Sequence, residues 1–575
     1  MSALPRLVVA APSSGHGKNA VSIGLLAAFR ERGLDVAGFK VGPDQVDAAY
    51  LGAAAAGRPG RNLDPRLVGP ERIAPLFAYG AAGAGLSLVQ GTMGLYDSVA
   101  GPSEVESTAA VATALRSPVV LVVDVSAMGQ SVAALVHGFR SYDELLWLGG
   151  VILNRVASPR HEELLREALD DIGVPVFGSL RRRDLPPMFP SRRYGAVPAL
   201  TGDPEVGRAV RRLAEGVAGA VDLDALLRLA RTAPPMTVEP WTPRPAGGTV
   251  AGRPVVALAG TTVGSYGYPE TGELLVAAGA EVVHVDPLRD EALPAGTVAL
   301  VVGGGLPEAY AEQLSANRRL RDAVAELVRA GRPVVAEGSG LLWLARELDG
   351  LPMCGVLDAT GVRRDGVVIG YREATACTDS PVAPRGAVRI GYKHHSAVLT
   401  PRAGEQPAWR WPGGAPEGFV WRGGYASQLT LHWAGVPEIA ARLVRAAALP
   451  AAPAAPASAP AAPAASASAS APRSAAAPGF VAPASASAGP AAAGTAAPAS
   501  PPPAPATPVP ATPNGPGQAV SADPGPVGPE VSAGPAEAAG SAPAVAGPAA
   551  IAVPAPAGPG TGGAARSDLG PEVPA

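Results

Sequence analysis

A glycine-rich loop near the start of the chain has the clearest pattern for chemistry. It follows the apolar run Leu7–Ala10, which predicts a buried strand, and helical spacing of apolar residues begins near Asn19. Gly15 and Gly17 permit backbone angles that side chains forbid, and Lys18 comes next. A strand, a glycine loop, a lysine and a helix build a phosphate cradle, because N–H groups at the helix start face the anion and the lysine reaches the outer phosphates. The pattern predicts nucleotide binding by Ser14, Gly15, His16, Gly17, Lys18 and Asn19.

The loop departs from the P-loop pattern G-x-x-x-x-G-K-[ST] at two positions. Pro12 stands at the first glycine, and Asn19 replaces the closing hydroxyl residue, which normally ligates Mg²⁺. The alternative interpretation is therefore a glycine-containing turn with an incidental lysine. Against it, Lys18 is one of only three lysines among 46 basic residues. A chain that otherwise uses arginine has a lysine where a compact ammonium suits a phosphate.

Composition excludes several classes of protein. The chain has 575 residues, enough for two or three domains, and a net charge of −3 with 17% charged residues, so no nucleic-acid or membrane partner is expected. No signal peptide and no apolar run of membrane-spanning length is seen. The two cysteines, Cys354 and Cys377, do not make a disulfide framework and are more typical of small buried residues in a reducing cytoplasm. The predicted location is cytoplasmic.

The order of predicted elements divides the chain into two α/β halves and a tail. Residues 1–235 alternate short apolar strands with helices, which predicts a doubly wound, mostly parallel sheet. Residues 236–253 are rich in proline and glycine and read as a linker. A second α/β pattern covers 254–446, with a helix predicted over Ala309–Val328. Residues 447–575 are Ala/Pro/Ser-rich with almost no aromatics, so a disordered tail is predicted.

Seven motifs in order carry a resemblance to a known family. They are VGPDQVDAAY, GRPGRNLDP, GTMGLYD, GGVILNRV, GGGLPE, ANRRLR and AEGSGLLWL, and the resemblance covers residues 6 to about 446. The chain is similar to the cobyrinic (or hydrogenobyrinic) acid a,c-diamide synthases of cobalamin biosynthesis. The resemblance implies a P-loop amide-ligase domain, related to dethiobiotin synthetase, followed by a class I glutamine amidotransferase-like domain. It also implies that ATP, with Mg²⁺, activates corrinoid carboxylates (of cobyrinate or hydrogenobyrinate), which ammonia from glutamine then amidates.

The resemblance assigns roles in the ligase half. The phosphate loop matches at Ser14, Gly15, Gly17 and Lys18, and Asn154 falls where the family recognises the adenine. Asp47 and Tyr50 fall at substrate-binding positions. The implied metal ligands include Asp44 and the family's glutamate at position 90, which is Gln90 here. Asn19 and Gln90 together predict a weakened magnesium site, because an anionic or well-placed oxygen is lost at each.

The glutaminase half departs further from the family. The elbow A-E-C-[GA]-G-L corresponds to 336–341, which puts Gly338 at the nucleophile, and the first histidine of S-Y-x-H-x-H-[WF], the implied general base, is Thr430. Glycine offers no nucleophile and threonine no base near neutral pH, so glutamine hydrolysis is predicted absent. The family's residue types are retained at His432, at His395 and at the oxyanion cradle Gly303, Gly304 and Gly305.

Three interpretations stay open at this point. The chain is a working a,c-diamide synthase; or a ligase that takes free ammonia, or ammonia from a partner glutaminase; or a non-catalytic paralogue that binds nucleotide, corrinoid or the active synthase as a regulator or scaffold. A homodimer or a pair with an intact paralogue would suit these interpretations. A minor alternative gives Ser339 the work of the missing thiol, with His395 or His432 as its base, although a serine beside glycines is more often turn filler.

Overall fold

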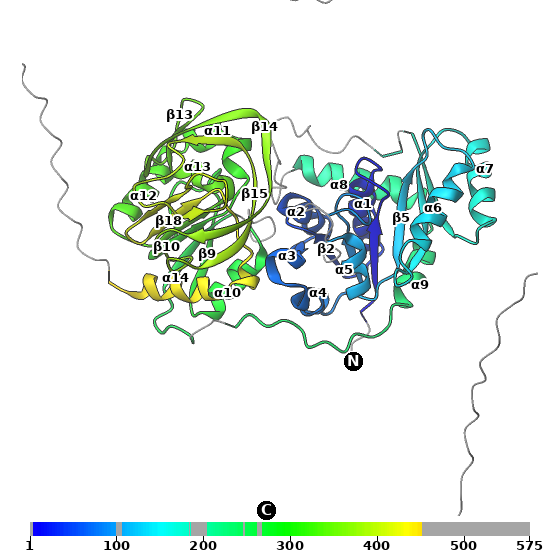
Figure 1. Ribbon diagram of the computed structural model, residues 1–575, viewed down its shortest axis with the longest axis horizontal. Coiled ribbons are helices and arrows are strands. Elements are labelled where there is room, and N and C mark those ends of the chain that lie inside the picture. Colours follow the sequence, from blue (N-terminus) through cyan, green and yellow to red (C-terminus); the bar gives the residue numbers. More distant parts are fainter. Residues whose placement is uncertain are drawn as a thin grey trace, which may run out of the picture. The chain divides into compact units, whose positions relative to one another are not determined.

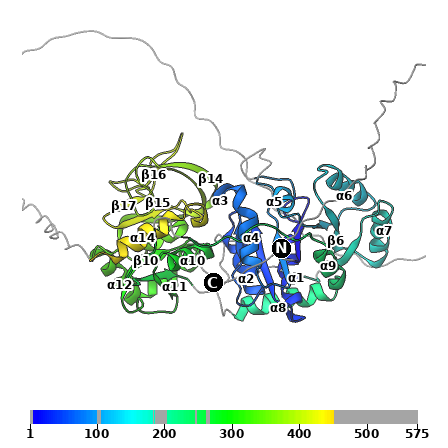
Figure 2. The same ribbon diagram turned by 90° about the horizontal axis from the view of Figure 1, so that it is seen from below.

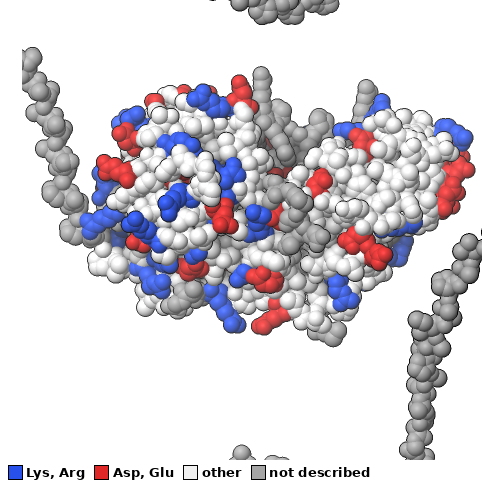
Figure 3. All heavy atoms as spheres, in the orientation of Figure 1, with Lys and Arg blue, Asp and Glu red and all other residues white. Residues whose placement is uncertain are grey.

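A computed structural model describes residues 4–98, 106–182, 184–185, 204–244, 248–260 and 267–450. The predicted tail lies outside the described residues from position 451 onward, as do residues 245–247 of the predicted linker. None of the described helices is both long and apolar enough to cross a membrane. Figure 3 shows basic and acidic side chains mixed over the face in view.

The first half contains a seven-stranded parallel sheet in the order β3-β2-β4-β1-β5-β6-β7 (Figure 1). This confirms the doubly wound sheet predicted from buried strands alternating with helices. Its strands are β1 (Arg6–Ala10), β2 (Val36–Val41), β3 (Arg61–Leu63), β4 (Leu86–Gln90), β5 (Val119–Asp124), β6 (Leu148–Val156) and β7 (Val176–Arg181).

Helices cover both faces of this sheet, because successive side chains of a strand point to opposite sides. Leu7 and Val9 of β1 join the apolar core under α1, α2, α8 and α9, whereas Val8 and Ala10 join the core under α3 to α7 (Figure 2). The helices are α1 (Lys18–Glu31), α2 (Gln45–Ala54), α3 (Pro65–Val68), a 3₁₀ turn (Pro70–Arg72), α4 (Ile73–Ala81), α5 (Thr108–Ala114), α6 (Ser131–Ser141), α7 (Pro159–Asp170), α8 (Pro204–Ala218) and α9 (Leu223–Arg231).

The second half contains a six-stranded sheet in the order β17-β18-β11-β10-β8-β9, parallel except for β17. Its strands are β8 (Val255–Ala259), β9 (Glu281–Val285), β10 (Thr297–Val302), β11 (Val334–Glu337), β17 (Phe419–Trp421) and β18 (Gly424–Ser427). The helical elements are α10 (Pro269–Ala277), α11 (Leu306–Ala316), α12 (Arg318–Arg329), a 3₁₀ turn (Gly338–Gly340), α13 (Leu341–Leu344), a 3₁₀ turn (Trp433–Gly435) and α14 (Glu438–Ala448).

The structure corrects two points about this half. The single helix predicted over Ala309–Val328 is two helices, because Asn317 leaves helical geometry and its side chain caps the second helix at Leu320 N. A further sheet was not predicted: β12 (Ala345–Leu348), β13 (Leu351–Pro352), β14 (Leu357–Ala376), β15 (Val388–Thr400) and β16 (Trp409–Arg410). Glycines and charges interrupt the alternation along β14, and only its long antiparallel pairing with β15 makes it a strand.

A buried ion pair links the two halves of the described chain. Arg61 of β3 is 7% exposed and donates to Glu270 Oε1 at 2.7 Å and to the carboxylate of Glu273, both on α10. Glu270 is fully buried. Tyr371 of β14 adds a hydrogen bond to Asp64 Oδ2 at 2.8 Å. The contact between the halves therefore depends on charges that are removed from water together.

Replacing Arg61 by methionine should lower the free energy of unfolding by about 3–5 kcal/mol, because Glu270 would keep a buried charge without its cation. Denaturant titration measures this. The matched control is Arg32→Met, whose partner Asp224 is exposed. That change should cost less than about 1 kcal/mol. Equally small losses of unfolding free energy in the two variants would contradict the predicted contribution of the Arg61 ion pair to stability.

Candidate functional site

The phosphate loop has the backbone that its glycines predict. Gly15 and Gly17 have φ of +95° and +92°, in the left-handed region, and Gly17 caps the N-terminus of α1. Asn154, at the end of β6, lies against this turn and donates through Nδ2 to His16 O at 2.8 Å. A Cβ built at Gly17 would come within 2.2 Å of Asn154 Nδ2, so a side chain there would displace Asn154. Asn154 thus supports the loop backbone directly.

His16 is held by the neighbouring strand. Its Nδ1 accepts the backbone N–H of Asp124 at 2.8 Å, at the end of β5. Burial lowers the pKa of His16, which keeps Nδ1 free to accept this hydrogen. Arg155 reaches Asp124 Oδ2 at 2.5 Å. Sequence reasoning missed Asp124 and Arg155, although both come at the carboxyl ends of strands, where ligands bind in such sheets.

Asp47 is the centre of a second group beside the loop. Asn19 Nδ2 donates to both of its carboxylate oxygens at 2.9 Å, and Gln90 Nε2 donates to Oδ2 at 3.0 Å. Lys40 Nζ lies 3.6 Å from the same Oδ2 and donates to Gly91 O at 2.8 Å. Lys40 and Gln90 are paired in register across β2 and β4. Two amides therefore donate hydrogen bonds to the carboxylate of Asp47, and the ammonium of Lys40 offsets its charge.

This arrangement offers a magnesium ion few protein ligands. The amide N–H groups of Asn19 and Gln90 face Asp47, whereas a cation needs oxygens. One such oxygen is present, because Gln90 Oε1 is buried and has no hydrogen-bond partner among the described residues. Asp44 Oδ1 is used as the cap of α2, where it accepts from Val46 N and Asp47 N. Among the described residues no group of three acidic, histidine or cysteine side chains is placed to hold a metal. A magnesium ion would have to arrive on the nucleotide phosphates with little help from these residues.

The two predicted substrate residues lie in different surroundings. Asp47 belongs to the group beside the phosphate loop just described. Tyr50, one turn further along α2, is 5% exposed and packs in the apolar core under α1 and α2.

A second site lies where three neighbouring strands of the second sheet end. Ser427 of β18 is paired with Glu337 of β11, and Val302 of β10 with Ala336. The residues that follow these strands are Gly303–Gly305, the turn at Gly338 and the segment to Thr430. They meet because carboxyl ends of adjacent parallel strands share one edge. The positions of the family's nucleophile, base and oxyanion cradle are thus brought together.

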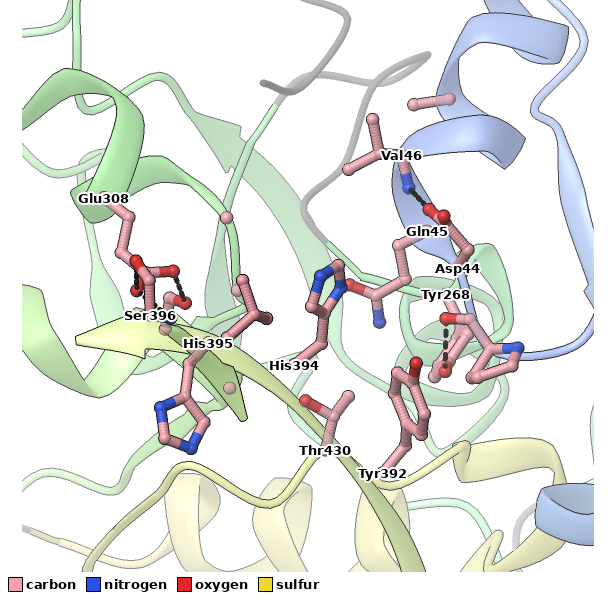
Figure 4. Close-up of a pocket in the computed structure, with 17 residues that line it drawn as sticks. Asp44, Gln45, Val46, Tyr268, Glu308, Tyr392, His394, His395, Ser396 and Thr430 are labelled. Atoms are coloured by element: carbon pink, nitrogen blue, oxygen red, sulfur yellow. Dashed lines mark hydrogen bonds between the residues drawn. The ribbon is translucent and has the colours of Figure 1, made fainter. Parts of the chain in front are cut away.

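The turn that the resemblance aligns with the family's elbow has a left-handed backbone and no side chain at Gly338. Gly338 has φ of +59°, the strained turn in which such a residue is displayed. A Cβ built on Gly338 would lie 2.8 Å from Thr430 Oγ1, so these two positions face each other. Gly304 lies against the next backbone amide, since a Cβ there would be 3.2 Å from Ser339 N. Figure 4 shows Thr430 among the residues that line the pocket at this site.

Ser339 is not paired with a histidine. Its Oγ donates to Glu308 Oε2 at 2.6 Å, and Glu308 Oε1 accepts from Ser396 N and Oγ and from Ala397 N (Figure 4). No hydrogen bond joins Ser339 to His395 or His432 in the described part of the chain. Ser339 therefore has a carboxylate as its partner and no imidazole base.

The two remaining histidines are neutral and buried. Burial lowers the pKa of both His395 and His432 to about 4. His432 stacks on Tyr268 with ring centres 4.0 Å apart, and its Nε2 is 3.8 Å from Glu270. His432 thus packs beside the ion pair that links the two halves.

Glu337, just before the elbow, is an acid that sequence reasoning left unassigned. It is 7% exposed, and its Oε2 accepts from Trp433 Nε1 at 3.3 Å. Burial raises its pKa to about 8, despite the hydrogen bond from Trp433. The side chain is therefore mostly protonated at neutral pH.

We expect the nucleotide affinity to depend little on magnesium. Addition of Mg²⁺ should change the ATP dissociation constant less than about twofold, because Asn19 and Gln90 offer the metal no anionic ligand. The double variant Asn19→Thr with Gln90→Glu restores the hydroxyl and the carboxylate and should gain about tenfold in affinity on adding magnesium. Calorimetric titration with and without EDTA measures both.

Two controls accompany this titration. Gln130→Glu adds the same charge at an exposed position and should leave the magnesium response unchanged. Lys18→Ala should abolish binding in either buffer. Tight binding by the unmodified chain only when magnesium is present would show that the amides rotate to accept the metal.

The pKa of Glu337 predicts a pH dependence of stability. The folded chain holds this proton up to a pKa of about 8, whereas the unfolded chain releases it near the ordinary glutamate pKa of 4.5. Between these values the folded state binds more protons, so stability is lost as pH rises, by up to about 1.4 kcal/mol per pH unit. Glu337→Gln should lose this slope. Parallel melting curves for the two proteins between pH 6.5 and 8.5 would overturn the assignment.

Comparison with known proteins identifies the family of both halves. The family model described as the CobQ/CobB/MinD/ParA nucleotide binding domain (CbiA) matches residues 7–191, and the CobB/CobQ-like glutamine amidotransferase domain (GATase_3) matches residues 263–427. Hydrogenobyrinate a,c-diamide synthase of Streptomyces coelicolor is 50% identical over 475 residues, covering 77% of this chain and 97% of that protein. The protein of that name from Thermobifida fusca is 44% identical over 465 residues, with the same coverage. Cobyrinate a,c-diamide synthase of Syntrophotalea carbinolica is 38% identical over 458 residues, covering 76% of this chain and 98% of that protein. The chain belongs to the cobyrinate and hydrogenobyrinate a,c-diamide synthase family.

Proposed function

We propose that this chain is an ATP-dependent amide ligase of cytoplasmic cobalamin biosynthesis that takes free ammonia in place of glutamine. Its substrate would be a corrinoid carboxylate, as in the curated relatives named for hydrogenobyrinate or cobyrinate. The nucleotide-binding half and the family membership support the ligase. The lack of a thiol and an imidazole at Gly338 and Thr430 in the second half supports ammonia, rather than glutamine, as the nitrogen donor.

One observation carries the proposal. The bare Cα of Gly338 faces Thr430 Oγ1, at the two positions where the family's elbow places a thiol and an imidazole. A class I amidotransferase needs the thiolate to attack the glutamine amide and the histidine to carry the proton. Neither group is present, and Ser339 is bound to Glu308 rather than to a base. The second half would then have a structural role and would not release ammonia from glutamine.

The ligase half would work through residues that the first sheet displays. The loop amides and Lys18 hold the phosphates, and Asn154 and Asp124 fix the loop through His16. A corrinoid carboxylate oxygen attacks the γ-phosphorus of ATP and ADP leaves. Ammonia then attacks the acyl carbon, the C–O bond to phosphate breaks, and a proton is lost as the amide forms. Positioning of the reactants supplies most of the rate in such transfers.

A second candidate is favoured by the group around Asp47. Asn19 and Gln90 replace metal-binding oxygens with N–H donors, which would slow phosphoryl transfer. The chain would then be a non-catalytic paralogue that binds nucleotide and corrinoid, or pairs with an intact synthase, as a regulator or scaffold.

Amidation assays with two nitrogen donors decide between these functions. With ATP and hydrogenobyrinate or cobyrinate, we expect amide product with ammonium chloride and none above background with glutamine. Product with neither donor, together with measurable nucleotide binding, would favour the non-catalytic candidate. Glutamine-dependent product that survives Ser339→Ala would refute the proposed loss of the glutaminase.

The glutaminase should return only when both missing groups are restored. Gly338→Cys or Thr430→His alone should release no more glutamate than the unmodified chain, because members of a catalytic unit act together. The double variant is the minimum repair, measured as glutamate released from glutamine. Full activity of Gly338→Cys alone would mean that another residue serves as the base.

A further inference from the structure

The amide of Asn154, the residue that the family resemblance assigns to adenine, is engaged within the protein. The side chain is buried, with 6% of its surface exposed. Its Nδ2 donates to His16 O at 2.8 Å, and its Oδ1 accepts the backbone N–H of Arg155 at 2.9 Å. An amide reads adenine by accepting from N6 and donating to N7, which needs both of its ends at the base. The amide of Asn154 holds the phosphate loop instead.

The strand order indicates where the base of a bound nucleotide lies. The phosphate loop follows β1, which has β4 on one side and β5 on the other, with β6 next to β5. Asp47 and Gln90, the predicted substrate and metal positions, lie on the β4 side. The reacting phosphate faces that side, and the base is at the opposite end of the nucleotide. The base therefore extends over the carboxyl ends of β5 and β6, at the edge of such a sheet where ligands bind.

Arg155 is displayed at this edge of the sheet, beside the phosphate loop. Its backbone has φ of +61°, a left-handed conformation that is uncommon for a residue other than glycine, and 52% of its side chain is exposed. Asp124 Oδ2, at the end of β5, accepts from the guanidinium at 2.5 Å, and the backbone N–H of Asp124 bonds His16 of the loop. A guanidinium has five N–H donors in a rigid fork, so this ion pair orients the group and leaves donors for a ligand.

An amide and a guanidinium favour different purines. The guanidinium donates two hydrogen bonds to O6 and N7 of guanine, whereas the N6 amino group of adenine is itself a donor and would face an N–H of arginine. The phosphate loop makes the same contacts with either nucleotide. We infer that Arg155, in place of Asn154, contacts the nucleobase, and that the chain binds GTP at least as tightly as ATP. The inference rests on the proposed function, in which a nucleotide occupies the loop.

Calorimetric titration of the full chain with GTP and with ATP tests this inference. The dissociation constant for GTP should equal that for ATP or lie below it. Arg155→Gln replaces the guanidinium by an amide and should shift the ratio of the two constants about tenfold toward ATP, the effect of exchanging one bidentate pair with a base. The matched control Arg160→Gln removes a cation that is exposed on α7 and paired with Glu163, and it should leave the ratio unchanged.

Inorganic tripolyphosphate separates a contact with the base from a contact with the phosphates. It has the phosphate charges without a base, so Arg155→Gln should leave its dissociation constant unchanged. An equal loss of affinity for GTP, ATP and tripolyphosphate would show that Arg155 acts on the phosphates and would overturn the inference. Binding of ATP more than about tenfold tighter than GTP by the unmodified chain would also overturn it, since one bidentate pair has that effect.

The same titrations keep the inference separate from the proposed function, because they need neither corrinoid nor ammonia. If the chain prefers ATP and amidates the corrinoid, the inference falls and the proposed function stands. If GTP binds at least as tightly as ATP, Arg155→Gln shifts the ratio, and neither nucleotide supports amidation, the inference stands and the proposed function falls. If neither nucleotide binds, both fall.

Discussion

Both candidate sites depend on one constraint, the meeting of the carboxyl ends of neighbouring parallel strands at one edge of a sheet. In the first sheet, β2, β4 and β1 are adjacent, and this places Lys40 and Gln90 in register beside the phosphate loop. In the second sheet, β10, β11 and β18 are adjacent, which brings the turns at Gly304, Gly338 and Thr430 together. The strand order is fixed by the apolar cores on the two faces of each sheet, and these cores do not depend on which side chains follow the strand ends.

The substitutions at the two sites have different physical consequences. In the first, Asn19 and Gln90 make new hydrogen bonds that satisfy Asp47, so the buried carboxylate has its partners without a metal. In the second, the bare Cα of Gly338 lies so close to Thr430 that a Cβ there would be 2.8 Å from Oγ1. The first site therefore keeps a hydrogen-bonded carboxylate, whereas the turn at the second site carries no side chain.

Packing accounts for some of the family residues that remain. His432 stacks on Tyr268 and lies beside Glu270, which pairs with Arg61 across the two halves. Glu337 holds the indole of Trp433 in the core of the second half. Loss of the His432 ring would leave a buried void beside Tyr268. Loss of the Glu337 carboxyl would leave the buried Trp433 Nε1 without a hydrogen-bond acceptor. Such residues would be retained even in a chain that hydrolyses no glutamine.

The sequence by itself determined the alternation of buried strands and helices in the two parallel sheets and the phosphate loop, and it predicts the two positions where a nucleophile and a base are missing. Buried strands and glycine turns are local patterns, so a parallel sheet with a loop at Gly15 to Lys18 follows from them. Only the tertiary structure decided what surrounds Asp47, that Ser339 bonds Glu308, and that β14 pairs with β15. Each of these joins residues far apart in the chain, and a hydrogen bond between such residues leaves no periodic trace in the sequence.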